Sequence, residues 1–266
     1  MIIDFHAHIY PEKIAVKAGQ SISKFYDDAP VRLRGTAEDL IENGSKAGVT
    51  KYVVQSVATN SAQVEGINNF ILSECKAHPE FIGFGTIHPE YENFAAELER
   101  IKAAGLKGVK VHPDFQEFRA DVESMDPVYA KMAELKLPVL FHAGDCRYDY
   151  SNPKYIANVH KKHPDLVIIA AHFGGYTQWD EAYEYLCGTD VYFDTSSTLW
   201  KLPVEKAKKM IAKHGYEKFL FGTDYPMWIH TEEIESLKVL GFTPEQTEAV
   251  MYKNALGLFK KCGIEI

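Results

Sequence analysis

The chain alternates short apolar runs with longer amphipathic stretches. Eight of the apolar runs are rich in β-branched residues and only a few residues long, which favours β-strands over buried helices. Many of them are apolar at both odd and even positions, as expected for strands that are covered on both faces of a parallel sheet. The predicted strands are residues 2–8, 51–58, 81–88, 106–112, 138–143, 166–172, 191–197 and 218–224.

The stretches between these runs carry the signals of helices. Residues 36–48 begin with a threonine cap and end at a glycine, and residues 127–138 end at a proline. Residues 91–105 have apolar positions at helical spacing. Residues 243–263 begin with Thr-Pro, followed by a glutamate where a capping box is expected.

Eight strands, most of them followed by a helix, predict consecutive βα units with parallel pairing and right-handed crossovers. In number and length these units match a (β/α)8 TIM barrel, formed as a single domain by residues 1–266, with its active site at the C-terminal ends of the strands. An open, doubly wound sheet is the alternative architecture. Residues 9–35 are longer than a usual βα connection, and in a barrel we expect them to form a flap over the site.

Composition narrows the class of protein. The 266 residues carry a formal charge of −8, and the pI is near 5.8, which argues against nucleic acid or an anionic membrane as a partner. No apolar run approaches the roughly 18 residues that cross a bilayer, and we expect no secretory signal because the N-terminus lacks a basic region and an apolar segment. The four cysteines are widely spaced without a CxxC pair, so we expect reduced thiols and a cytoplasmic protein.

Histidines end the predicted strands on the side where a barrel places its active site. His6 and His8 are two residues apart in the first strand, so their side chains point to the same face. Other strands end in four more histidines and one aspartate, which are His88, His112, His142, His172 and Asp224. A barrel brings all of these side chains to one rim.

Imidazole and carboxylate groups at one rim are the ligands that zinc and similar divalent ions prefer. His6 and His8 supply two nitrogens, and His142 and Asp224 can reach the barrel axis from other strands. His172 is either a further ligand or a general acid or base beside the ion. The sequence therefore predicts a catalytic metal centre, in which the ion activates a bound water or acts as a Lewis acid.

The ordered set of motifs resembles the amidohydrolase superfamily, and within it the amidohydrolase-related branch that includes aminocarboxymuconate-semialdehyde decarboxylase. The similarity runs over essentially the whole chain and rests on IIDFHAHIYP, GVKVHPDFQ, PVLFHAG, HFGG, VYFDTSS and LFGTDYP. The resemblance implies a metal-bearing (β/α)8 barrel, usually with zinc and sometimes with manganese. It also implies that His6, His8, His142 and Asp224 are the metal ligands and that His172 has a separate, catalytic role.

Four further residues are predicted to contact the substrate. Lys110 and His112 share one face of their strand, Arg147 can clamp a substrate carboxylate with two hydrogen bonds, and Trp179 can wall the pocket. For each of them a structural role is the alternative, as a salt bridge at the rim, a packing residue or a solvated loop side chain. We predict one zinc ion per chain, because four good ligands are available; a second metal held by a carboxylated Lys110 is the alternative.

The main functional prediction is a hydrolase that acts on a lactone, ester or amide through metal-activated water, with Asp224 as the catalytic group that takes the proton of that water. The alternative is a nonoxidative decarboxylase of a small unsaturated or aromatic acid. A third hypothesis is a noncatalytic barrel that binds a metal or a ligand. The predicted partner is a small molecule, in particular one with a carboxylate, and assembly into homo-oligomers is compatible with the sequence.

Overall fold

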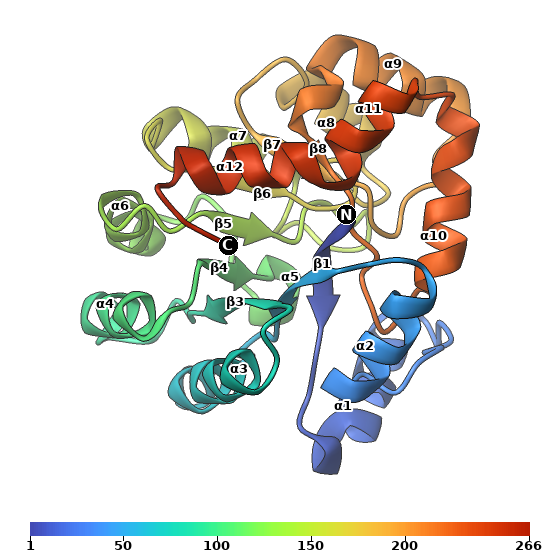
Figure 1. Cartoon of the computed structure of the whole chain (residues 1–266). Coiled ribbons are helices and arrows are strands. Elements are labelled where there is room, and N and C mark those ends of the chain that lie inside the picture. Colours follow the sequence, from blue (N-terminus) through green and yellow to red (C-terminus); the bar gives the residue numbers. More distant parts are fainter.

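Eight parallel strands, paired in sequence order, form the centre of the structure (Figure 1). The computed structural model describes residues 1–266. The strands are β1 (Ile3–His8), β2 (Lys51–Gln55), β3 (Phe81–Thr86), β4 (Gly108–Val111), β5 (Val139–Phe141), β6 (Ile168–Ala170), β7 (Tyr192–Asp194) and β8 (Phe219–Leu220). The segment after β8 returns to β1, where the Phe5 N–H donates to the Phe221 carbonyl and the His8 N–H to the Tyr225 carbonyl, each at 2.8 Å. These bonds join the first and last strands, so the sheet is the predicted (β/α)8 barrel and not an open sheet.

Helices surround the strands as an outer ring (Figure 1). They are α1 (Glu12–Phe25), α2 (Ala37–Lys46), α3 (Val64–Ala77), α4 (Phe94–Ala104), α5 (Pro113–Gln116), α6 (Asp126–Glu134), α7 (Pro153–Lys162), α8 (Trp179–Tyr185), α9 (Val204–His214), α10 (His230–Leu237), α11 (Pro244–Glu248) and α12 (Asn254–Lys261). Short 3-10 turns lie at Ser61–Gln63, Glu123–Met125, Tyr216–Lys218 and Lys238–Leu240, and a π-helical turn, Ala249–Lys253, joins α11 to α12. The four predicted helical stretches correspond to α2, α4, α6 and the α11–α12 segment.

Of the two helix caps predicted from the sequence, one is observed as predicted and the other uses a different residue. The Thr36 side chain accepts a hydrogen bond from the Asp39 N–H at the start of α2, as the sequence predicts. At α11 the capping box is made by Thr243 with Gln246, not with a glutamate. The predicted glutamate, Glu245, is one residue too early. Pro244 is the first helical residue, so Gln246 occupies the third helical position, which a capping box requires.

The strands are shorter than predicted, and this places the site residues in loops. β6 ends at Ala170 and β8 at Leu220, so His172 and Asp224 belong to the segments that follow. The backbone φ angles of His172 and Asp224 are 61° and 60°. A left-handed conformation is unfavourable for residues with a Cβ atom and is concentrated at functional sites. The orientation of these two side chains is therefore set by tight loops and not by the alternation of side chains along a strand.

An extra residue in β1 directs both histidines into the barrel. Pairing between β1 and β2 advances three residues from Asp4 to Ala7 while β2 advances two, which is a β-bulge. Within the bulge, Phe5 packs in the interior of the barrel, and the next residue, His6, lines the cavity at the mouth together with His8. The bulge thus lets β1 contribute to the interior packing and to the site in immediate succession.

Two apolar cores hold the barrel. The larger one fills the space between strands and helices. The smaller one lies inside the barrel and includes Phe5, Phe84 and Phe259, where Phe5 and Phe259 stack with their ring centroids 5.5 Å apart. Phe259 belongs to α12, which lies across the barrel beside both chain termini (Figure 1). The end opposite the histidines is therefore closed by packed side chains, and the site opens at one end only.

The long connection after β1 covers the mouth of the barrel, as expected for residues 9–35. It contains α1, which the sequence analysis did not identify as a helix. Tyr10, Ile22 and Tyr26 from this segment line the cavity above the histidines. The flap is thus an ordered helix whose inner face forms part of the site.

Two expectations from composition can be compared with the structure. All four cysteines are free thiols. None of the helices combines the length and the apolar character that spanning a membrane requires.

Candidate metal centre

Six of the predicted site residues meet in one small chamber at the mouth of the barrel. The chamber has a volume of about 30 Å³. Its walls are His6, His8, Tyr10, Ile22, Tyr26, Lys110, His112, Phe115, His142, Asp224, Pro226 and Met227. These side chains come from the ends of β1, β4, β5 and β8 and from the flap, so distant parts of the chain build the site together.

The ligand atoms of His6, His8 and Asp224 face one another. The two histidine Nε2 atoms are 3.2 Å apart, and Asp224 Oδ1 lies 3.4 Å from His6 Nε2 and 3.7 Å from His8 Nε2. Ligands bonded to one tetrahedral zinc ion at about 2.0–2.2 Å are separated by roughly 3.3–3.6 Å. Two nitrogen lone pairs and a carboxylate at these distances fit a shared divalent cation.

A buried aspartate that the sequence analysis missed orients His6. Asp194 at the end of β7 is fully buried, and its Oδ2 lies 2.8 Å from His6 Nδ1. We assign the proton of His6 to Nδ1, because this nitrogen donates to Asp194 and leaves the Nε2 lone pair directed at the chamber. Burial alone would raise the pKa of Asp194, but the neighbouring His6, His172 and Ser196 together outweigh it and keep the pKa below its usual value. The aspartate of VYFDTSS was the available signal, since outer carboxylates commonly orient metal-binding histidines.

His172 lies behind the chamber and contacts His142. His172 Nε2 is 3.1 Å from His142 Nδ1, and His172 Nδ1 is 3.1 Å from the Ser196 carbonyl oxygen. With a proton on each Nδ1, His172 donates to Ser196 and His142 donates to His172. Burial lowers the pKa of His172 to about 4, so the ring is neutral near pH 7. This hydrogen-bond chain fixes both rings and leaves His142 Nε2 without a partner.

His142 stands slightly apart from the other predicted ligands. Its ligand atoms group with those of His112 and Asp114 and not with those of His6 and His8. The His142 ring stacks on His112 with the centroids 3.8 Å apart, and its Nε2 is 3.6 Å from Asp114 Oδ2. The unpartnered, buried Nε2 of His142 is the type of donor atom that a metal ion satisfies.

The two charged groups of the chamber have shifted pKa values. Burial alone would raise the pKa of Asp224, but the neighbouring His6, His172 and His8 outweigh it and lower the pKa to about 2. Burial lowers the pKa of Lys110 to about 8, against the opposing effect of Asp194 and Asp224. Lys110 Nζ lies 3.2 Å from His6 Nε2, beside the donor set. At neutral pH the chamber therefore contains an anionic carboxylate and, in its floor, an amine close to its titration point.

Aromatic rings form one wall of the chamber, beside His142. His112 stacks between His142 and Phe115, with a centroid distance of 3.8 Å to each. Its Nδ1 accepts a hydrogen bond from the Phe115 N–H and caps α5, and its Nε2 is 3.3 Å from the Tyr26 hydroxyl oxygen. His112 thus caps a helix and also borders the chamber, and its contact with a substrate stays a prediction.

Trp179, a predicted substrate residue, and His88 do not line the chamber. Trp179 is buried at the start of α8, where its indole N–H donates to the His172 carbonyl at 3.0 Å. This contact supports the strained backbone of His172. His88, which the sequence also placed at the rim, accepts a local hydrogen bond from the Glu90 N–H and lies outside the chamber.

Arg147 is held by partners within the protein. Its guanidinium donates twice to Asp145, at 3.0 Å and 2.7 Å, and also to the Phe25 carbonyl at 2.6 Å and to Asp27 at 3.1 Å. It lies 5.0 Å from the centre of the Tyr26 ring. Arg147 therefore ties the C-terminal end of α1 to the loop after β5, and the free guanidinium needed to clamp a substrate carboxylate is not seen.

Replacing Arg147 with alanine is expected to loosen the flap. The change removes the hydrogen bonds to Phe25 and Asp27 and leaves the buried Asp145 carboxylate unpaired. A loss of about 1–3 kcal/mol in the stability of the closed flap corresponds to an increase of roughly 5- to 150-fold in local opening. Hydrogen exchange of residues 12–25 measures this opening.

Arg100→Ala is the matched control for this prediction, because Arg100 pairs with Glu97 on the outer helix α4. It should leave exchange in residues 12–25 unchanged. Equal protection of α1 in Arg147→Ala and in the wild type would show that Arg147 does not hold the flap.

Comparisons with known proteins agree with this architecture. Residues 3–261 match a family model described as amidohydrolase. No curated protein matches the chain. Among solved structures, an uncharacterized TIM-barrel protein from Bordetella bronchiseptica aligns with a TM-score of 0.78 and 21% identity, covering 98% of this chain and 99% of that one.

Two further structures have functional descriptions. A dihydroxybenzoic acid decarboxylase from Polaromonas, with bound manganese and the inhibitor 2-nitroresorcinol, has a TM-score of 0.76 and 17% identity and covers 97% of this chain and 96% of its own. A proposed 2-pyrone-4,6-dicarboxylic acid hydrolase from Pseudomonas putida has a TM-score of 0.71 and 18% identity and covers 98% and 97%. At these identities the likeness shows a common fold.

Proposed function

The chain belongs to the amidohydrolase family, and from this premise we propose that it is a metal-dependent carboxy-lyase that releases CO₂ from a small aromatic or unsaturated carboxylic acid. The observation that carries the proposal is the chamber itself. Flat rings of Tyr26, His112 and Phe115 face a cluster of metal-ligand atoms, with Lys110 in the floor. A planar acid matches this combination, because its ring can lie against aromatic walls while its carboxylate meets positive charge.

The donor set supports one divalent ion per chain. We assign His6, His8 and Asp224 as ligands, with the unpartnered His142 Nε2 as the fourth. Nitrogen-rich ligands favour zinc, and manganese is the alternative in view of the manganese-bound decarboxylase with the same fold. When bound, the ion supplies a Lewis acid that neutralises negative charge on the substrate.

The residues of the chain then position the acid and move one proton. When the bond to the carboxyl carbon breaks, CO₂ leaves and the electron pair stays on the ring carbon, which must take up a proton. Asp224 is deprotonated at neutral pH, since its pKa is about 2. It takes a proton transiently from a water molecule and passes it to that carbon, and the hydroxide left behind is neutralised by the solvent. Ser197 donates to Asp224 Oδ2 at 2.6 Å and orients the carboxylate. His172, held by Trp179 and Ser196, keeps His142 in place.

A hydrolase, the main prediction from the sequence, is the second candidate. The same anionic Asp224 can accept the proton of a water molecule that attacks a lactone carbonyl, and the proposed pyrone hydrolase has the same fold. The neighbours described as decarboxylases support the carboxy-lyase better. Homo-oligomer formation and a cytoplasmic location stay predictions from the sequence.

A parallel assay of both chemistries tests the proposal. Protein stripped of metal and reloaded with zinc or manganese is given a panel of hydroxybenzoic acids and a panel of lactones. We expect CO₂ release from at least one hydroxybenzoic acid and no release from the stripped protein. Lactone opening without CO₂ release would instead establish the hydrolase. Stoichiometric metal binding without turnover of either panel would favour the noncatalytic barrel.

A further inference from the structure

A groove of about 720 Å³ lies between α1 and α3. The residues of α1 that line it include Ile14, Ala18, Ile22 and Phe25, which follow helical spacing along one face. Ile67 and Phe70 of α3 line the groove as well. Two helices thus present apolar side chains to one open space of the size of a small-molecule site.

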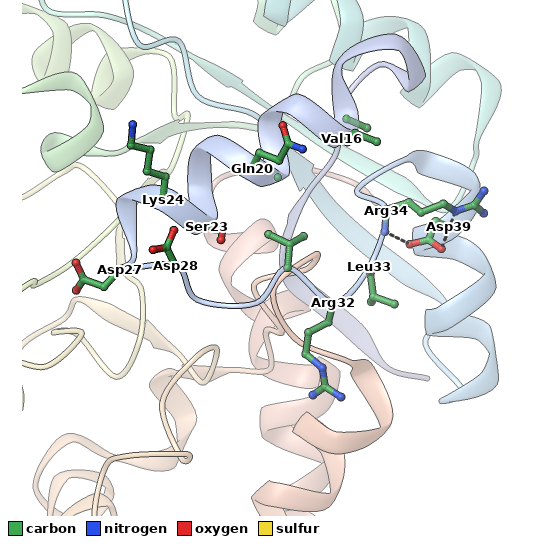
Figure 2. Close-up of a pocket in the computed structure, with 13 residues that line it drawn as sticks. Val16, Gln20, Ser23, Lys24, Asp27, Asp28, Arg32, Leu33, Arg34 and Asp39 are labelled. Atoms are coloured by element: carbon green, nitrogen blue, oxygen red, sulfur yellow. Dashed lines mark hydrogen bonds and ion pairs between the residues drawn. The ribbon is translucent and has the colours of Figure 1, made fainter.

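The apolar face of α1 is not buried in the core, although Phe25 at its end packs on Phe115 and Tyr148. Only Ala15 and Gly19 of this helix are buried, and both border the opposite side of α1, where a second groove lies (Figure 2). Figure 2 shows charged side chains around that second groove, including Lys24, Asp28 and Arg32. The charged side chains of that second groove can be solvated, whereas leaving the apolar inner groove hydrated costs about 25 cal/mol per Å² of apolar surface.

The inner groove adjoins the metal chamber. His8, Tyr10, Ile22 and Phe115 line both spaces. The chamber, at about 30 Å³, is far smaller than the groove of about 720 Å³. A further substituent on the acid therefore has room in the groove and not in the chamber.

We propose that the substrate is an amphiphilic acid, whose carboxylate reaches the metal ligands and whose apolar alkyl or aryl substituent lies in the groove between α1 and α3. This inference rests on the proposed function. Lys17 and Glu117, the charged lining residues apart from the buried Asp114, are exposed to solvent. The groove therefore recognises the substituent by its apolar surface and shape and not by charge.

Gly66 of α3 allows the groove to be blocked without disturbing the fold. It lines the groove, and a Cβ atom at this position would meet no atom within 4 Å. Gly66→Trp therefore fills open space. Ser21→Trp obstructs the same groove from α1, where Ser21 is exposed. Gly66→Ala and Gly257→Trp are the controls, since Gly257 lies on α12 and its added Cβ also meets nothing within 4 Å.

The test compares binding of benzoate and 4-pentylbenzoate to the zinc-loaded protein by titration calorimetry. In the wild type and both controls we expect 4-pentylbenzoate to bind at least about 10-fold more tightly than benzoate, because its pentyl chain is transferred from water into the apolar groove. In Gly66→Trp and Ser21→Trp this advantage should fall below about 3-fold, while benzoate affinity stays unchanged. No advantage in the wild type, or the same advantage in both blocked variants, would overturn the inference.

The experiments distinguish failure of the carboxy-lyase proposal from failure of the groove proposal. Loss of the pentyl advantage in the blocked variants, together with absence of CO₂ release from any acid, would uphold the groove and refute the carboxy-lyase. CO₂ release from compact acids, with no pentyl advantage in the wild type, would uphold the carboxy-lyase and refute the groove as the site of the substituent.

Discussion

In a His6→Ala variant we expect both bound metal and turnover to be lost. His6 offers Nε2 to the donor set, 3.2 Å from His8 Nε2 and 3.4 Å from Asp224 Oδ1. The change also removes the partner of the buried Asp194 carboxylate. Loss of an outer partner of a metal ligand already lowers metal affinity about 10- to 100-fold, so loss of the ligand itself should exceed that range.

Elemental analysis of the purified variant and a metal titration followed by calorimetry measure the effect. His88→Ala is the matched control, because His88 is also a buried histidine after a strand but lies outside the chamber. It should retain one ion per chain and normal turnover. A His6→Ala protein that is folded by circular dichroism and still holds one ion would show that the metal centre lies elsewhere.

An Asp224→Asn variant should lose rate far more than metal. The amide oxygen can still approach the position of Oδ1, and Ser197 can accept a hydrogen bond from the new NH₂ group in place of the one it now donates to Asp224. Asparagine carries no charge and cannot take up a proton. We therefore expect partial metal retention and a fall in turnover of roughly 10²–10⁴-fold, the contribution of a positioned acid or base.

Metal content and turnover must be measured on the same preparation. Asp190→Asn is the control, since Asp190 is an exposed carboxylate paired with Lys218 away from the chamber. It should match the wild type in both measurements. Full activity of Asp224→Asn would remove Asp224 from the proton transfer in the decarboxylation and in the alternative hydrolysis alike.

Local pattern was sufficient for the architecture. Strands buried on both faces of a parallel sheet are apolar at both odd and even positions. All eight strands predicted from this pattern are observed in the predicted order. The polar residues that end these strands were also recognisable, because a barrel has one functional end. For this reason His6, His8, Lys110, His112, His142 and Asp224 could be placed in one site before the structure was known, and all six line the chamber.

The signal for the flap was weaker. Residues 12–25 contain a glycine, serines and β-branched residues, which have low helix propensity. The apolar face of α1 lines a groove and is not packed in the core. The segment therefore lacks the strong apolar pattern of a core-facing helix. The length of the connection predicted a cover over the site, and the structure showed that the cover is a helix.

The sequence by itself determined the βα repeat, the single barrel and the side of the barrel on which the chemistry lies, because strand burial and strand-end polarity are local properties of the chain. Only the tertiary structure decided which partners these residues have. Asp194 reaches His6 across 188 residues, and Arg147 holds Phe25 across 122 residues instead of facing the chamber. Such contacts depend on how the barrel closes and how each loop turns, and no short segment of sequence contains that information.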